Sequence, residues 1–293
     1  MPAQPRWAIL PLVGVGMLIA AVAHAQSDIT YRTLSTSRQV VDEEELRVMV
    51  RFGLGHFHFA GDPGNALYRT TLVYIEGAFE PEQEYDHDKH ALSIALSEGP
   101  EDRNFNLRNL RELQQRLDVN VSPIVPIRVD LELGAVSVNI DLGGLSLLEA
   151  EVRTGASEGS LRFSRPTLTA CERLEFQIGA ADFSVEQLGN SNCARMEFQG
   201  GAGRFTLDFT GQWRREGETR ASVDIGVGAL TLRFPSHLGV AITLDRFLAT
   251  FDHSGFVKRG DVYYSSNYDE TEARLRLDID AVLGAIDVVW VPR

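Results

Sequence analysis

The sequence predicts an all-β fold of stacked strand-corner-strand repeats, similar to a β-solenoid, with a short helix in an insertion. Short runs of strictly alternating apolar and polar residues fill most of the chain after Asp28, which is the pattern of half-buried strands. Glycines, 26 in 293 residues, punctuate these runs at recurring intervals. A chain that is 44% hydrophobic and 24% charged also has the composition of a globular protein.

Seven glycines align the repeat when they are treated as equivalent positions without gaps. The residues five before, three before and six after the glycine are apolar in every copy, whereas the residue five after is mostly small and polar. Successive glycines from Gly134 to Gly226 lie 21, 24, 22 and 25 residues apart, a period near that of one solenoid coil. We expect each glycine to form a tight corner that permits positive φ. The aligned glycines are Gly53, Gly134, Gly155, Gly179, Gly201, Gly226 and Gly284.

The same columns predict which side chains face the core. A two-sheet sandwich of hairpins is also compatible with the alternation, but stacked strands explain better why equivalent positions share one environment. The residues expected to be buried are Phe176, Phe198, Phe205, Leu207 and Leu232. Those expected to be exposed are Glu175, Glu197, Thr206 and Thr231, with Ser157 and Ser184 in an outward polar ladder.

The N-terminal 25 residues have the pattern of a secretory signal peptide. Arg6 precedes an apolar stretch from Trp7 to Val22, and a small-x-small site ends at Ala25. An uncleaved membrane anchor is the alternative, but the stretch is short for the ~20 residues of a span and contains Pro11. We therefore expect cleavage after Ala25 and export to the periplasm or the extracellular space.

The rest of the chain divides at two prolines. Pro123 and Pro126 predict a boundary between an N-terminal β domain over residues 26–121 and a repetitive domain over residues 122–293. Leucines near a 3.6-residue period predict a helix from Asn104 to Asp118 within the first domain.

The repeat lapses in two insertions, residues 62–128 and 236–278, where a functional site could lie. The acidic composition argues against nucleic-acid binding, because 28 Lys and Arg face 41 Asp and Glu, a formal charge of -13.

The glycine-centred runs resemble a known family. The segments from Val129 to Ala135, from Asp141 to Leu145 and from Val152 to Ser157 are similar to the toast-rack family of stacked β-domains in bacterial envelope proteins. Residues Gly255 to Tyr268 resemble the closing segment of that family, and Arg47 to Tyr85 resemble its N-terminal domain. The family includes LiaF-like regulators of the cell-wall antibiotic response, and the resemblance implies no catalytic residue.

Four histidines are candidates for a metal site. His56 and His58 alternate on one predicted strand, with Phe57 between them pointing inward, and His87 and His90 lie in a polar segment downstream. Together they could bind zinc or copper. A solvated strand edge and a polar loop explain them more simply, so no metal and no cofactor is expected.

An acidic column is the second candidate for a cation site. Asp130, Glu151, Glu175 and Glu197 each lie four residues before an aligned glycine, so stacking places them ~4.8 Å apart. Either Ca²⁺ or the neighbouring Arg153 would relieve their repulsion, although a hydrated acidic face is the simpler explanation. The same carboxylates could also form the acid/base pair of a polysaccharide-cleaving β-helix enzyme.

Cysteine spacing predicts a disulfide between Cys171 and Cys193. Both lie eight residues before an aligned glycine, and their separation of 22 equals the local repeat, so stacking brings them within bonding distance.

An aromatic and polar loop is a candidate for binding a sugar or a peptide. Its residues are Tyr263, Tyr264, Asn267 and Tyr268. Closure of the stack is the alternative role. The sequence as a whole predicts an exported, non-enzymatic interaction or structural module of the envelope that binds a protein or a glycan. A secreted enzyme acting on polysaccharide is the alternative, and the oligomeric state is open.

Overall fold

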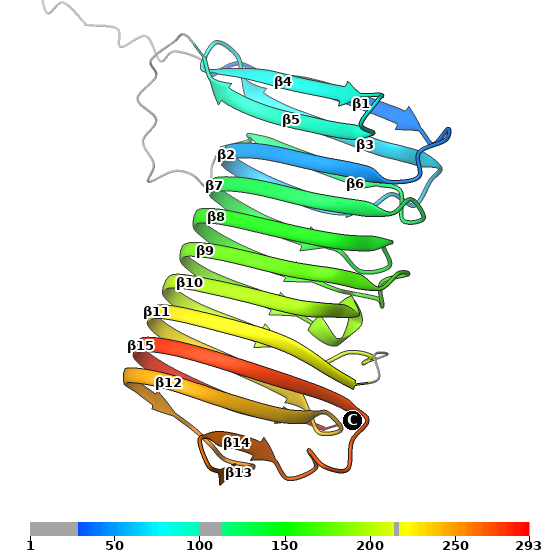
Figure 1. Cartoon of the computed structure of the whole chain (residues 1–293). Coiled ribbons are helices and arrows are strands. Elements are labelled where there is room, and N and C mark those ends of the chain that lie inside the picture. The colour runs from blue at the N-terminus through cyan, green and yellow to red at the C-terminus, as the bar shows by residue number, and fades with distance from the viewer. Residues whose placement is uncertain (1–28, 100–112, 214–216, 293) are drawn as a thin grey trace, which may run out of the picture.

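A computed structural model describes residues 29–99, 113–213 and 217–292. Within these ranges the chain forms one 15-stranded sheet that winds into a stack of coils (Figure 1). The strands of the N-terminal part are β1 (Tyr31–Gln39), β2 (Leu46–Gly61), β3 (Ala66–Ile75), β4 (Phe79–Asp86), β5 (Ala91–Glu98) and β6 (Arg116–Val121). Those that follow are β7 (Ile127–Asp141), β8 (Leu147–Arg162), β9 (Cys171–Glu186), β10 (Cys193–Asp208), β11 (Gly217–Pro235), β12 (Gly239–Phe251), β13 (Phe256–Arg259), β14 (Val262–Ser265) and β15 (Ala273–Val291).

Long bent strands form the body of the stack. Strands β2, β7, β8, β9, β10, β11, β15 and β12 pair in that order, each parallel to the next. Each strand bends at its middle, so its two limbs lie on opposite faces of the stack and enclose the core (Figure 1). The predicted unit of strand, glycine corner and strand is confirmed.

The corner reverses the inward and outward alternation. In β9, Phe176 and Ile178 are buried, Gly179 and Ala180 are both exposed, and Phe183 is buried again. Two consecutive outward residues therefore let both limbs direct their apolar side chains into one core. The residues predicted to be core are all buried: Phe176, Phe198, Phe205, Leu207 and Leu232.

The outward positions are less exposed than expected. Glu175, Glu197, Thr206 and Thr231 are half-buried, because each is covered on both sides by the equivalent residue of a neighbouring strand. Ser157 differs more strongly, since it is buried beside the corner of β8.

Close approach of the backbone, not positive φ, explains most of the aligned glycines. A Cβ on Gly179 would lie 2.5 Å from the carbonyl oxygen of Gly155, and one on Gly201 would lie 2.7 Å from that of Gly179. Neither glycine has positive φ, contrary to the expectation. Positive φ occurs instead further along the strand, as at Gly203 and Gly228.

The alignment of the last glycine was wrong by two residues. Gly284 pairs with Gly228, and Val282 occupies the column of Gly226. The error arose because 58 residues separate Gly226 from Gly284, so the intervening insertion hid the true spacing. A shift of two residues preserves which side chains point inward, and the predicted burial therefore survived it.

The second insertion extends the stack. Its first strand, β12, pairs in parallel with β15 and adds another coil beyond the C-terminal strand. The antiparallel hairpin of β13 and β14 then continues the sheet, with β14 pairing only with Ala241–Thr243 of β12. The chain thus inserts β12 to β14 before it returns to form β15 (Figure 1).

The predicted helix is only partly testable. Residues 104–112 lie outside the described part of the chain, and the remaining residues are not helical. Arg116–Val121 forms β6, in which Leu117, Val119 and Val121 alternate inward against β2 and β3. The period of two beyond Leu117 outweighed the leucines at helical spacing. The proposed boundary between residues 121 and 122 remains a prediction, and β2 pairs directly with β7 across it.

The predicted disulfide is confirmed. Cys171 pairs with Cys193 between β9 and β10, and the two form a disulfide with their Cα atoms 4.2 Å apart.

A buried polar cluster covers the N-terminal end of the core. The Glu43 carboxylate accepts hydrogen bonds from Arg38 Nε (3.0 Å), from the Val41 N–H (2.7 Å) and from the Tyr85 hydroxyl (3.2 Å). Burial by itself raises the pKa of this carboxyl, but the backbone N–H groups of Val41 and Glu43, with Arg38 and Tyr85, outweigh it and lower the pKa to about 2.

Candidate binding groove

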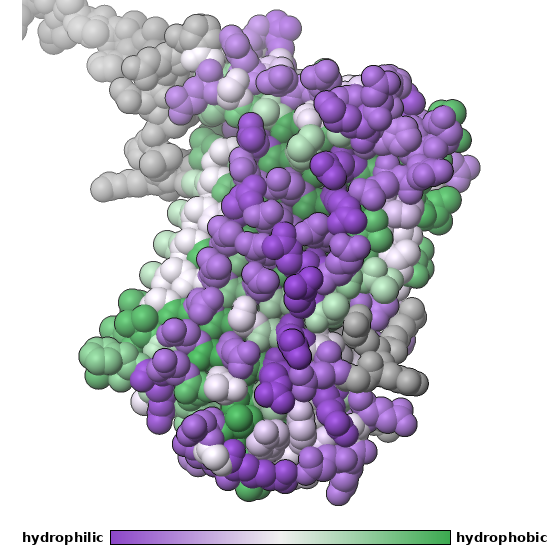
Figure 2. Space-filling model, viewed as in Figure 1, coloured by the Kyte–Doolittle hydropathy of each residue, from purple (hydrophilic) through white to green (hydrophobic). Residues whose placement is uncertain are grey.

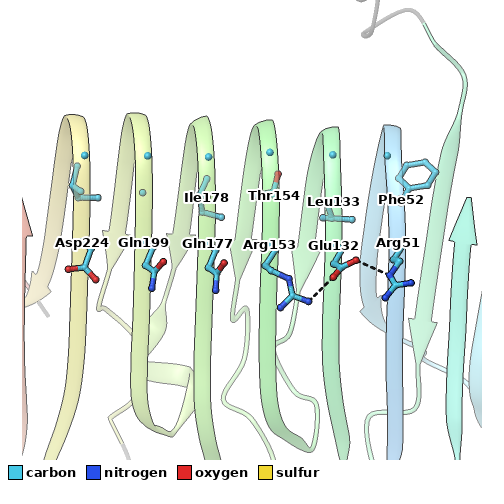
Figure 3. Close-up of a pocket in the computed structure, with 18 of the residues that line it drawn as sticks. Arg51, Phe52, Glu132, Leu133, Arg153, Thr154, Gln177, Ile178, Gln199 and Asp224 are labelled. Carbon is cyan, nitrogen blue, oxygen red and sulfur yellow. Dashed lines mark hydrogen bonds and ion pairs between the residues drawn. The ribbon is translucent and has the colours of Figure 1, made fainter. Parts of the chain in front are cut away.

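A long groove runs across the coils beside the glycine corners. Its volume is 1220 Å³, and strands β2, β7, β8, β9, β10, β11 and β15 all contribute to it. The aligned glycines leave room there because they carry no side chain, and the residues two positions earlier form one wall (Figure 3). That wall consists of Arg51, Glu132, Arg153, Gln177, Gln199, Asp224 and Asp280.

The charges at the N-terminal end of this wall compensate one another. Arg51 Nε lies 2.8 Å from Glu132, and Arg153 Nη2 lies 3.0 Å from Glu132 and 2.8 Å from Asp130 (Figure 3). Burial alone raises the pKa of Glu132, but Arg153 and Arg51 outweigh that effect and lower it. The carboxylate therefore stays ionised at neutral pH.

The middle of the wall carries the neutral amides of Gln177 and Gln199, and its C-terminal end carries carboxylates alone. Asp224 pairs with Asp280, which pairs on its other side with Asp245 of β12. Asp224 is exposed overall, but partial desolvation of its carboxyl, followed by the nearby Asp280 carboxylate, raises its pKa. Within the described residues none of these three carboxylates forms an ion pair.

The inner side of the groove is mainly apolar. Leu133, Ile178 and Ile225 line it, each one residue before a glycine. Thr154 takes the same place in β8, is 5% exposed, and its hydroxyl has no hydrogen-bond partner among the described residues. Because the side chains of Leu133, Ile178 and Ile225 are buried in the core, a ligand in the groove would meet mainly the polar wall and the glycine positions.

Exposed apolar side chains close the C-terminal end of the groove. The glycine column ends there, since Val282 replaces glycine in β15 and Phe247 follows at the corner of β12. Phe247 is 80% exposed and Leu248 is 63% exposed. Figure 2 shows apolar surface gathered at this corner of the molecule. Val227 and Leu283, also exposed, complete the patch.

The four candidate metal-binding histidines do not come together. His56 and His58 lie on β2 beyond the Gly53 corner, beside β6 and β7. His90 immediately precedes β5 and lies beside the first limb of β2, where its carbonyl accepts a hydrogen bond from the Arg47 N–H. No group of three potential metal ligands forms within the described ranges.

The predicted acidic column exists, and arginines neutralise part of it. Asp130, Glu151, Glu175 and Glu197 pair in consecutive strands. Arg153 forms ion pairs with Asp130 and Glu151. Arg173 Nη1 lies 2.9 Å from Glu175, and Gln177 donates a hydrogen bond to the same carboxylate. The column therefore contains its own counter-charges.

Internal contacts occupy the predicted tyrosine loop. Asn267 donates to the carbonyl of Ser236, and the Tyr268 hydroxyl donates to Glu218. The rings of Tyr264 and Tyr268 are 4.9 Å apart, and that of Tyr263 packs at 5.2 Å against Phe251. These contacts hold the β14 end of the stack together, and the loop's role in binding remains a prediction.

Sequence analysis missed the groove, although its signal was present. The residue two before each aligned glycine is polar in Arg51, Glu132, Arg153, Gln177, Gln199 and Asp224. The incorrect alignment of Gly284 also placed Asp280 two positions away from its true neighbour, Asp224.

No helix in the described ranges is both long and apolar enough to cross a membrane. Among solved structures, a proposed cell adhesion protein from Clostridium sporogenes is 18% identical, with a TM-score of 0.49, over 89% of this chain and 100% of its own. A proposed adhesin from Bacteroides fragilis is 10% identical, with a TM-score of 0.38, over 88% and 97%. A proposed lipid binding protein from Parabacteroides distasonis is 10% identical, with a TM-score of 0.33, over 88% and 96%.

None of the curated proteins matches this chain. A family match does exist: residues 22–170 match the N-terminal domain of toast_rack, DUF2154. Since this match covers half of the sequence and includes the aligned glycines from Gly53 to Gly155, the protein belongs to the toast-rack family.

Proposed function

We propose that this protein is an exported, non-enzymatic interaction module of the cell envelope that binds an extended glycan or protein segment along the glycine groove. The observation that carries this proposal is the continuous groove of 1220 Å³, to which seven consecutive strands contribute. Neighbouring parallel strands are ~4.8 Å apart, so the wall offers polar groups at a regular spacing. A ligand with a repeating backbone fits such a surface better than a compact small molecule does.

The chemistry of the wall favours binding over turnover. Gln177 and Gln199 present neutral amides that both donate and accept hydrogen bonds, as hydroxyl and peptide groups require. The middle of the wall repeats one kind of group, the two neutral amides, whereas an active site needs dissimilar groups brought together in one place.

One observation favours the alternative, a polysaccharide-cleaving enzyme. Asp224 and Asp280 are adjacent in the groove, and the pKa of Asp224 is raised. Glycosidases use a pair of carboxyl groups at the bond that they cleave.

Retention and product release distinguish the two functions. The purified protein is incubated with peptidoglycan and with neutral and acidic polysaccharides, and both bound protein and soluble fragments are measured. Retention without fragments supports binding. The control variant is Asp287→Asn, which changes an exposed carboxylate on the other limb of β15. Release of fragments by the natural protein and by this control, but not by Asp224→Asn, would establish the enzyme.

Export is tested separately. N-terminal sequencing of the protein recovered from outside the cytoplasm should begin at Gln26. An intact Met1 terminus on that protein would contradict the proposed signal peptide.

A further inference from the structure

We propose that the free edge of β12 binds an extended, positively charged and partly apolar segment of a partner protein, which adds to the sheet as a further strand. The proposal rests on the proposed function, because this edge lies at the C-terminal end of the same groove. Three properties of the corner formed by β11, β15 and β12 support it: an unpaired strand edge, a group of carboxylates and an exposed apolar patch.

The first property is the unpaired strand edge. Strand β12 pairs with β15 along Gly239–Phe251, but on its other side it pairs with β14 only from Ala241 to Thr243. From Leu244 to Phe251 that side has no partner strand within the described residues. Such an edge offers a row of backbone N–H and C=O groups to an incoming strand.

The second property is the negative charge beside this edge. Asp245 lies on β12 itself, Asp280 lies on the adjacent β15, and Asp224 lies on β11 beyond it. All three are exposed. The one arginine in the same stretch of β12, Arg246, donates to the carbonyl of Ala249 and not to a carboxylate. Lysine or arginine side chains of a partner would therefore meet three carboxylates that form no ion pair with any described residue.

The third property is the exposed apolar patch. Phe247 and Leu248 are exposed on this edge strand, and Val282 and Leu283 lie next to them on β15. An exposed apolar edge strand is a site of aggregation unless something covers it. A partner segment with apolar side chains would cover the patch while its basic side chains reach the carboxylates.

Charge also argues against the other occupants. Two copies of this chain joined through this corner would bring two sets of three carboxylates together, which costs free energy. An anionic membrane surface would be repelled for the same reason. The other end of the groove is less suitable, because Arg51 and Arg153 already neutralise Glu132 there.

Labelled peptides test the proposal on the whole mature protein. The probe is a ten-residue peptide of alternating lysine and leucine, and its binding is measured by fluorescence anisotropy. Two control peptides replace either lysine by glutamate or leucine by serine. A third places proline at two of the lysine positions, which removes backbone N–H groups that an added strand needs. We expect each control to bind roughly tenfold more weakly or worse.

Matched variants locate the site. The triple variant Asp224→Asn, Asp245→Asn, Asp280→Asn and the single variant Phe247→Ser should each weaken binding of the lysine-leucine peptide by roughly tenfold. All four positions are exposed, so these variants should fold. The charge-matched control changes three exposed carboxylates of β4 at the opposite end of the stack, namely Glu80→Gln, Glu82→Gln and Glu84→Gln, and should bind normally.

Several results would overturn the inference. Equal binding by both triple variants would mean that net charge alone attracts the peptide. Full binding of the proline peptide would exclude strand addition. If analytical ultracentrifugation shows that the protein is a dimer and that Phe247→Ser is a monomer, a second copy covers the edge. If the inference fails while glycan retention still depends on the groove, the proposed function stands without it.

Discussion

Cys171 lies directly opposite Cys193 across the parallel pair of β9 and β10, and the two are joined by a disulfide. The bond closes a loop of 22 residues, one turn of the stack. On the chain-entropy model, its loss should lower the free energy of unfolding by roughly 3 kcal/mol. Urea unfolding of the protein with and without a reductant measures this difference. Two free thiols in the purified, unreduced protein would contradict the pairing.

The core columns predict a large contrast between an inward and an outward position of β10. Phe198 is buried and packs 5.5 Å from the ring of Phe205, whereas Thr206 is half-buried on the outward side. Phe198→Ala should therefore destabilise the protein by ~3 to 5 kcal/mol, and Thr206→Ala by less than ~1 kcal/mol. Thermal and urea unfolding of the two variants decide the matter. Similar losses of stability in both variants would mean that the inward and outward faces of the strand are assigned incorrectly.

The glycine column predicts a position-dependent effect of one methyl group. An alanine at Gly179 would place its Cβ 2.5 Å from the Gly155 carbonyl oxygen, so the two coils would have to separate. Gly179→Ala should cost ~1 to 3 kcal/mol of stability. Gly53 begins the same column and has no atom within 4 Å of its Cβ position, so Gly53→Ala is the matched control and should be tolerated. Equal destabilisation by both would exclude close approach as the reason for the glycines.

The Glu43 cluster predicts a specific dependence on pH. The pKa of the Glu43 carboxyl is lowered from 4.5 to about 2 in the folded protein. The stabilisation of the folded state by the ionised Glu43 is therefore complete above about pH 4.5 and disappears as the pH falls toward 2. Glu43→Gln should be less stable than the natural protein at pH 7, and the difference should shrink between pH 4.5 and 2. Urea unfolding at several pH values measures it, with the exposed Glu80→Gln as control. A difference that does not change with pH would show that ionisation of Glu43 is not what stabilises this end.

The columns of the repeat were predictable from sequence because a stack gives equivalent residues one environment. Phe176, Phe198 and Leu232 were therefore assigned correctly to the core. The register of β15 was not predictable, because Gly226 and Gly284 lie 58 residues apart with an insertion between them, and alternation cannot detect a shift of two.

The groove required the three-dimensional register. Asp245 belongs to an insertion, and nothing local to its sequence indicates that it lies beside Asp280. The fold also keeps the candidate histidines apart, and no metal site was expected of them. His90 precedes β5, and β5 pairs with β2 only along the first limb of β2. His56 lies on the other limb, beyond the Gly53 corner, so the two histidines stay apart.

The most direct test of the binding groove is to fill it. Gln199 is exposed in the wall of the groove, and Asn139 is an exposed residue on the other limb of β7. Retention on whichever envelope glycan or peptide the natural protein binds is measured for Gln199→Trp and Asn139→Trp. We predict that Gln199→Trp abolishes retention, whereas Asn139→Trp is retained as strongly as the natural protein. Undiminished retention by a folded Gln199→Trp protein would contradict the claim that the glycine groove is the binding surface.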